Sequence, residues 1–225
     1  MKKIFSAILI TACLAGGSAI AQSVTQAKTI LNQVSKKYKA YATLKTDFVV
    51  AVSSPQSETR GSQSGTLVSQ SGTGKFRVTL YSPAGKLAVE QEIISDGKTQ
   101  WTYLKRDNEV QVSNVDNSAT GINPAHLFTM YEKGYKSLYT GDQKQGGKVY
   151  QAIELSPVSA SPTVFKVKLL IDKSTKLIRS AQIFDKNGNR YLYTLSNFIP
   201  NPKVAGNYFS FDAKAHPGVD VEDLR

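Results

Sequence analysis

The sequence predicts a mainly β fold in which one amphipathic helix precedes an antiparallel meander of strands. Three observations support this prediction. Apolar residues recur every three or four positions near the N-terminus, alternate at every second position through most of the remaining chain, and are separated there by residue pairs that form tight turns. Hydrophobic residues make up 40% of the 225, which is enough for the core of one domain.

Residues 1–21 have the pattern of a secretory signal peptide, so residues 22–225 are expected to form the single domain. Two lysines supply the positive end, a short apolar run follows, and Ala19-Ile20-Ala21 forms a small-x-small cleavage site before Gln22. The apolar run is too short to span a bilayer, which needs about 20 residues. We therefore expect export to the periplasm, with cleavage before Gln22.

Cys13 allows a second interpretation of the same segment. The residues Ile10-Thr11-Ala12-Cys13 resemble a lipobox, in which the cysteine is lipidated and becomes the mature N-terminus. The small and apolar residues Leu14–Gly17, together with the alternative cleavage site, favour the unlipidated product. In that case the only cysteine leaves with the signal, and no disulfide framework forms within the chain. Metabolic lipid labelling distinguishes the two products.

The first element of the mature chain is a predicted amphipathic helix from Ser23 to about Tyr41. Ser23 is a plausible N-cap, and the basic residues near the end of the segment suit the negative end of the helix dipole. The apolar positions that define its buried face are Val24, Ala27, Ile30, Leu31, Val34, Tyr38 and Tyr41.

After this helix the period changes to two, which predicts strands. Asp96-Gly97 and Asn187-Gly188 are typical of tight hairpin turns, because both residue types tolerate positive φ. Regular spacing of such runs favours an antiparallel meander in one sheet. The alternating runs are residues 48–53, 76–81, 87–94, 101–103, 110–112, 149–155, 165–171, 178–184 and 191–199.

A short helix is predicted in the middle of the meander. Asn123 is a candidate N-cap, and Pro124 fits the first helical position. Leu127, Phe128 and Tyr131 would then share one face. This helix should pack on one side of the sheet.

The sequence offers no catalytic constellation and no metal or cofactor site. His126 and His216 lie in no motif with a nucleophile or a carboxylate, and one cysteine with two histidines leaves too few soft ligands for zinc or an iron–sulfur cluster. Glu90 and Glu92 share one strand face, and such a pair most often forms a solvated surface. We therefore expect a non-enzymatic protein without a cofactor.

The formal net charge of +11 has to be interpreted with the predicted export. A basic cytoplasmic protein would suggest nucleic acid as a partner, but an exported protein rarely encounters any. The lysines and arginines are also scattered through strands and turns. We expect no nucleic-acid binding, and either a solvated basic surface or attraction to anionic headgroups or an acidic partner.

One strand face is rich in aromatic and aliphatic residues, and it is the candidate binding surface. The alternation allows two interpretations, an ordinary dry core or an apolar cavity for an acyl ligand, because curved sheets hold apolar ligands in other β folds. The candidate lipid-binding residues, including two from the short central helix, are Phe48, Val50, Leu67, Phe76, Val78, Leu80, Leu87, Ile93, Trp101, Tyr103, Leu127 and Phe128.

The order of several short motifs resembles that of the LolA-type family of periplasmic outer-membrane lipoprotein carriers. The resemblance extends from about Thr29 to Arg225, and its most specific piece is the run Ile94–Tyr103. The matching pieces are Leu44–Phe48, Gly65–Leu67, Lys75–Arg77, Ile94–Tyr103, Asn123-Pro124, Phe209–Phe211 and Gly218–Arg225.

The resemblance implies a strongly curved, unclosed antiparallel β-barrel with helices covering its concave face. It implies a monomeric carrier that accepts triacylated lipoproteins from an inner-membrane ABC transporter complex and delivers them to an outer-membrane acceptor, whose identity is open. The alternative is an envelope-stress sensor or lipid-binding module with the same half-barrel fold, itself lipidated at Cys13 in one version. Diverse lipoproteins should co-purify with a shuttle, and one regulatory partner with a sensor.

The chain departs from the family at one position. The best-studied members carry an arginine just before the strand that begins at the Phe76 position, where it bonds the helical lid and helps to hold the empty carrier closed. Here residues Ser69–Gly74 contain no arginine, although Phe76 itself matches a functional aromatic residue of the family. The closed state is therefore expected to be held in another way or weakly.

Overall fold

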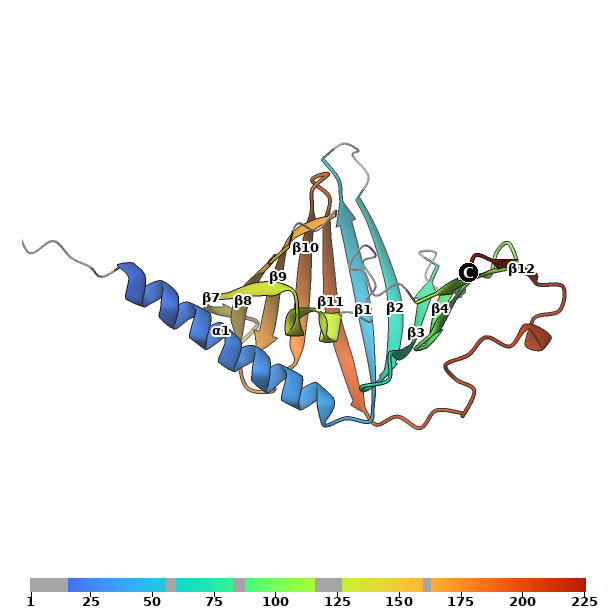
Figure 1. Ribbon diagram of the computed structural model, residues 1–225, viewed down its shortest axis with the longest axis horizontal. Helices are drawn as coiled ribbons and strands as arrows, with labels where there is room; N and C mark the ends of the chain where they lie inside the picture. The colour runs from blue at the N-terminus through green and yellow to red at the C-terminus, as the bar shows by residue number, and fades with distance from the viewer. Residues whose placement is uncertain (1–15, 56–59, 83–87, 116–126, 160–162) are drawn as a thin grey trace, which may run out of the picture.

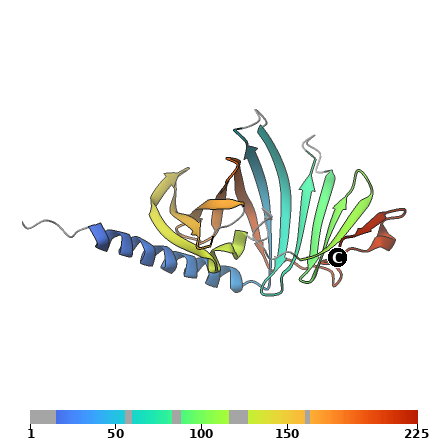
Figure 2. The ribbon, with the colours of Figure 1, turned by 45° about the horizontal axis from the view of Figure 1, so that its top comes forward.

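The computed structural model describes residues 16–55, 60–82, 88–115, 127–159 and 163–225. Within them the strands form one twelve-stranded sheet in the order β12-β6-β5-β4-β3-β2-β1-β11-β10-β9-β8-β7. All neighbours pair antiparallel except β12 and β6, which are parallel. The two ends of the sheet do not meet, and Figure 2 shows the strands bending into an arch above the N-terminal helix. The predicted curved, unclosed sheet is confirmed.

The strand bounds follow the predicted alternation closely. The nine predicted runs fall on β1, β3–β6 and β8–β11, with residues 87 and 88 before the start of β4, while β2, β7 and β12 were not among them. The strands are β1 Thr43–Ser53, β2 Arg60–Gln70, β3 Lys75–Tyr81, β4 Val89–Asp96, β5 Thr99–Leu104, β6 Glu109–Asn114, β7 Tyr135–Gln145, β8 Lys148–Pro157, β9 Val164–Asp172, β10 Ile178–Asp185, β11 Arg190–Pro200 and β12 Asp220–Asp223.

Helix α1 spans Gly16–Lys39 and lies along the side of the sheet near β7 (Figure 1). Its buried residues are Ala27, Ile30, Leu31, Val34 and Tyr38, which is the face that the sequence predicts. The predicted start was wrong, because Ser23 lies within the helix and does not cap it. Residues upstream of Ser23 include alanines, which are the strongest helix formers, so the helix continues toward the N-terminus.

The pairing of the strands assigns each residue to one of two faces of the sheet. We call the face that packs against α1 the inner face and the opposite one the outer face. On the inner face Phe48 is opposite Gly65, and Leu67 is opposite Val78, which in turn is opposite Ile93. The buried core joins this face to α1 and to residues 127–131, and across the sheet it runs from β3 to β8.

Gly65 shows why one position of β2 has no side chain. A Cβ atom at this position would lie 2.4 Å from the Phe48 ring and 2.7 Å from the carbonyl oxygen of Thr79. The fully buried Phe48 ring therefore crosses the strand in the space that glycine leaves open.

The short central element differs from the predicted helix. Its described part is a 3₁₀ helix, η2, at Met130–Glu132, preceded by 3₁₀ geometry at Leu127 and Phe128. The predicted cap and first turn, Asn123 and Pro124, lie outside the described residues. Leu127, Phe128 and Tyr131 are buried together as predicted, since three-residue spacing places side chains on one side of a 3₁₀ helix as well.

The C-terminal segment after β11 covers part of the outer face. The Arg77 guanidinium lies 4.8 Å from the centre of the Tyr208 ring, and one of its nitrogens donates to the Ser210 carbonyl oxygen over 3.4 Å. The segment includes the short 3₁₀ helix η3, Ala213–Ala215, and ends in β12 beside β6. Among the described residues, no helix is both long enough and apolar enough to cross a membrane.

Candidate functional site

A cavity of about 480 Å³ lies where the C-terminal half of α1 and η2 meet three strand ends. These are the N-terminal ends of β1 and β3 and the C-terminal end of β2. Its apolar wall includes Tyr38, Leu44, Phe76, Leu127 and Phe128. The volume falls within the range of about 300–1,000 Å³ that small-molecule sites occupy. The inner face of the sheet therefore has an open apolar space at one end and a packed core at the other.

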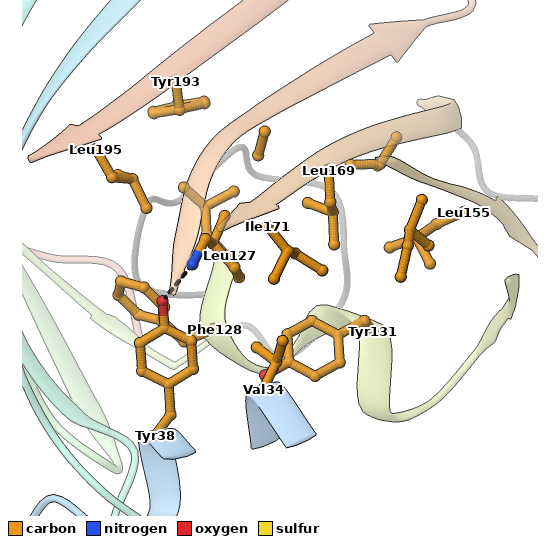
Figure 3. Packing of buried hydrophobic residues seen from close by; sticks show 14 of the residues in the cluster. Val34, Tyr38, Leu127, Phe128, Tyr131, Leu155, Leu169, Ile171, Tyr193 and Leu195 are labelled. Atoms are coloured by element: carbon orange, nitrogen blue, oxygen red, sulfur yellow. Dashed lines mark hydrogen bonds between the residues drawn. The ribbon is translucent and has the colours of Figure 1, made fainter. Parts of the chain in front are cut away.

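Tyr38 fixes α1 to the sheet at the inner wall of this cavity. Its ring lies 4.6 Å from that of Phe128, and its hydroxyl oxygen accepts a hydrogen bond from the backbone N–H of Ile178 over 2.9 Å. Figure 3 shows this bond among the buried residues of the inner face. Burial raises the pKa of the Tyr38 hydroxyl well above its usual value, so the group stays neutral and keeps its bond.

Tyr131 lies in the same core but has a different polar environment. Its side chain is buried, and its hydroxyl has no hydrogen-bond partner among the described residues. Burial raises the pKa of this hydroxyl too. A buried hydroxyl without a partner lowers stability, because it has lost the hydrogen bonds that it made with water.

Glu132 connects η2 to α1 at the polar rim of the cavity. The hydroxyl of Ser35 donates to its carboxylate over 2.5 Å, and the ammonium of Lys39 lies 2.8 Å from the same oxygen. Partial burial opposes ionisation, but the bonds from Lys39 and Ser35 and the charges of Lys39 and Lys133 outweigh it and lower the pKa of Glu132. We call Ser35, Lys39 and Glu132 the clasp.

The structure brings most of the predicted lipid-binding residues together on the inner face. Three of them, Phe76, Leu127 and Phe128, line the cavity itself. The other buried members of the inner core are Phe48, Leu67 and Val78. The remaining inner-face members, Val50, Leu80 and Ile93, are partly buried against that core, whereas Leu87 lies outside the described residues.

The prediction that Trp101 and Tyr103 share this face was wrong. Trp101 is opposite Ile94, and Tyr103 is opposite Glu92, so both side chains belong to the outer face. The error came from the phase of the alternation, because Ile93 and Ile94 are both apolar and either could continue the inner row. Successive residues of a strand point to opposite faces, so a shift of one position moves the whole strand face.

On the outer face Tyr103 forms a separate small core with the C-terminal segment. The Tyr103 ring lies 5.3 Å from that of Phe211 and 4.5 Å from that of His216, and these last two rings are stacked at 4.7 Å. The Tyr103 hydroxyl donates to the Asn108 side chain over 3.0 Å. The apolar surface of β5 and β6 is thus covered by the chain itself.

The sequence-based site missed two parts of the structure. The inner-face residues of β8–β11, such as Leu155, Leu169 and Leu195, follow the same alternation as β1–β4 and could have been included on that signal. The clasp left no signal in the sequence, because its members lie 97 residues apart. Among the described residues, no three His, Cys, Asp or Glu side chains lie close enough together to hold a metal ion.

Comparisons with known proteins identify relatives of this chain. The family model described as outer membrane lipoprotein carrier protein LolA matches residues 39–212. The outer-membrane lipoprotein carrier protein of Haemophilus influenzae is 30% identical over 159 residues, which are 69% of this chain and 73% of the relative. That of Actinobacillus succinogenes is 28% identical over 220 residues, which are 96% and 93%. An uncharacterized conserved protein from Thermus thermophilus has a similar fold, with a TM-score of 0.59, 12% identity, and coverage of 88% of this chain and 99% of that one.

Proposed function

This chain belongs to the LolA family of outer-membrane lipoprotein carrier proteins, and we propose that it binds the acyl chains of lipoproteins and carries them through the periplasm. The observation that carries the proposal is the cavity of about 480 Å³ beside Phe76, Leu127 and Phe128. It opens onto the inner-face core, so acyl groups could extend from the cavity along the same apolar surface. The carrier performs no chemical reaction in this proposal.

The volume of the cavity implies that α1 or η2 moves when cargo binds. If each methylene takes about 30 Å³, the volume share of one water, three chains of about sixteen carbons need on the order of 1,400 Å³. That is about three times the present cavity. The inner-face core beneath α1 would supply the remaining apolar surface once the clasp opened.

A closed empty state also explains how a carrier can both bind and release its cargo. Each methylene removed from water contributes about 0.8 kcal/mol, so a rigid open groove would hold long acyl chains too firmly to deliver them. Re-forming the packing of Tyr38 on Phe128 and the bonds of Glu132 offsets part of that binding free energy. The clasp thereby takes the place of the arginine that is absent from residues 69–74.

The proposed setting follows from the N-terminal segment and the family. The predicted signal peptide would direct the protein to the periplasm, with an inner-membrane ABC transporter as the donor and an outer-membrane acceptor. Residues 1–15, including Cys13, lie outside the described residues. Helix α1 continues across the predicted cleavage site, where residues 20–22 are exposed.

Binding of an acyl probe by the purified mature chain tests the proposal. We expect saturable binding of a fluorescent fatty acid that Phe76→Ala weakens by at least about ten-fold, because one buried Phe side chain contributes about 1.5–3 kcal/mol. Phe211→Ala is the matched control, since it removes the same side chain from the outer face. Equal effects of both variants, or no binding by the wild type, would contradict the proposal.

Co-purification from cells tests the carrier role beyond simple lipid binding. A carrier should be isolated with several different lipoproteins, and their amount should fall in Phe76→Ala. Isolation with one regulatory protein and no lipoproteins would instead indicate the sensor interpretation.

A further inference from the structure

The outer face of the sheet carries a cluster of cations around two phenylalanines. Lys166, Phe184 and Arg190 are direct cross-strand neighbours on β9, β10 and β11. Phe165 sits at a register shift, so its side chain turns outward, where it is 47% exposed and its ring lies 6.1 Å from that of Phe184. We call Phe165, Lys166, Lys168, Phe184 and Arg190 the outer basic patch.

The positive charge of this patch is only partly neutralised. The three cationic groups lie 5.2–5.8 Å from the centre of the Phe184 ring. Glu154 is shared by Lys166 and Lys168 at long distances of 4.0 and 3.9 Å, and within the described part of the chain Arg190 forms no ion pair. Three cations therefore face a single carboxylate, and Lys168 and Arg190 are exposed.

Exposed apolar side chains continue the patch along the same face. Leu192 is 38% exposed on β11, in the cross-strand row that also contains Lys168. Val49 is 46% exposed on β1, in the next row on the same face. Cations, one exposed aromatic ring and exposed aliphatic groups thus occur together on the side of the sheet opposite the cavity.

We propose that the outer basic patch docks the protein on a surface of anionic phospholipids. Guanidinium and ammonium groups would contact the phosphates, while the exposed Phe165 ring would lie at the boundary between headgroups and acyl chains. A folded acidic protein fits less well, because a stable interface needs about 20–30 residues on each side and the patch has five. Adsorption to headgroups needs no such area, since each Lys or Arg near the surface adds to the attraction.

This docking mode leaves the cavity free. The patch and the cavity lie on opposite faces of the sheet, so α1 and η2 could open while the outer face rests on the membrane. The inference therefore does not depend on the nature of the cargo, and it stands if the acyl-binding proposal fails.

Co-sedimentation with vesicles tests this inference, using the mature chain from Gln22. We expect partition onto vesicles of equal parts phosphatidylglycerol and phosphatidylcholine, none onto phosphatidylcholine alone, and loss of binding in high salt. Each lysine near an anionic surface should contribute about five-fold. The double variant Lys166→Glu/Lys168→Glu should therefore reduce the partition by more than about twenty-fold.

The matched control reverses two lysines beside the β7–β8 turn, which lies at the other end of the strands from the patch. Lys144→Glu/Lys148→Glu changes the net charge equally on the exposed β7–β8 hairpin and should retain most of the binding. Equal loss in both double variants would show that total charge alone governs adsorption and would overturn the proposal.

The phenylalanine gives a second, charge-neutral test. Phe165→Ser should weaken binding to the anionic vesicles without changing the circular dichroism spectrum or the affinity for the acyl probe. Failure of the wild type to bind anionic vesicles, equal binding to neutral ones, or patch-dependent binding of an acidic protein alone would refute lipid docking.

Discussion

Two tyrosines in the inner core have opposite hydrogen-bond status, although both are buried. Tyr38 accepts the Ile178 N–H, so replacing it with phenylalanine leaves a buried backbone donor without a partner. Such a loss costs about 1–3 kcal/mol. We expect Tyr38→Phe to lower the free energy of unfolding in urea by that amount.

The second tyrosine serves as the internal comparison. Tyr131→Phe removes a hydroxyl that has no partner among the described residues, so the free energy of unfolding should stay the same or rise. A loss of stability in Tyr131→Phe comparable to that in Tyr38→Phe would show that its hydroxyl is hydrogen-bonded in solution.

The clasp predicts a pH dependence of cavity opening. Because the folded-state pKa of Glu132 lies below its unfolded value, the clasp contributes fully above the ordinary glutamate pKa of about 4.3 and is lost as pH falls through the folded pKa. Fluorescence of an apolar probe should therefore rise on acidification. Glu132→Gln should show higher fluorescence already at neutral pH and a smaller acid response.

Another carboxylate with a lowered pKa provides the control for this titration. Asp142 pairs with Lys173 on an exposed part of β7, away from the cavity, and hydrogen bonds from Lys173 and Tyr139 lower its pKa. Asp142→Asn should leave the acid response of the probe unchanged. A response that shifts equally in both variants would mean that general acid unfolding, and not the clasp, produces the signal.

At the scale of single residues, the sequence could predict which positions are buried more readily than what they touch. The period of two identified Phe76, Val78 and Leu67 as one face, because backbone geometry imposes that period on every strand. It could not decide the face of Trp101, since two adjacent isoleucines precede the turn. The pairing of Glu132 with Ser35 depends on tertiary packing, which no local pattern encodes.

At the scale of elements, the C-terminal segment acts as a cover for the outer face of β5 and β6. Val110 and Val112 are buried there, outside the inner core, and Phe209 of the segment is buried as well. The apolar side of the sheet therefore changes from the inner face at β3 to the outer face at β5 and β6, where Thr102 and Gln111 lie on the inner face. Each of these strands still has one apolar face, as the predicted meander anticipates, but the alternation alone does not tell on which side of the sheet that face lies.

This cover predicts a local effect of mutation. Phe209→Ala should lower the hydrogen-exchange protection of the Val110 and Val112 amides, because the segment that covers them loses its buried anchor. Protection at Leu169 in the inner core should remain unchanged. Phe165→Ala, which removes an exposed ring, should alter neither region, and a uniform loss of protection in Phe209→Ala would show that the two cores unfold together.

For the whole molecule, the fold places the cavity and the outer basic patch on opposite faces of the sheet. The inner face, α1 and η2 enclose the cavity, whereas the outer face carries the basic patch and the C-terminal cover. The architecture was predictable because helix and strand periods are local. The sequence could not predict how far the cavity is closed, because this depends on how α1 packs against η2. Residues 116–126, which precede η2, lie outside the described part of the chain.

Opening of α1 away from η2 is the motion on which the carrier proposal depends, and it can be blocked chemically. A chain that begins at Gln22 contains no cysteine, so Ser35→Cys/Glu132→Cys introduces its only two thiols. A short, cleavable bifunctional thiol reagent should join α1 to η2 and abolish binding of a triacylated lipopeptide, and cleavage of the reagent should restore it. A crosslinked Lys144→Cys/Lys148→Cys variant should bind normally, because that hairpin lies away from the cavity. The present cavity is too small for three acyl chains, so the proposal requires this opening. Undiminished binding by the crosslinked clasp would contradict it, because the cargo would then have entered without α1 moving away from η2.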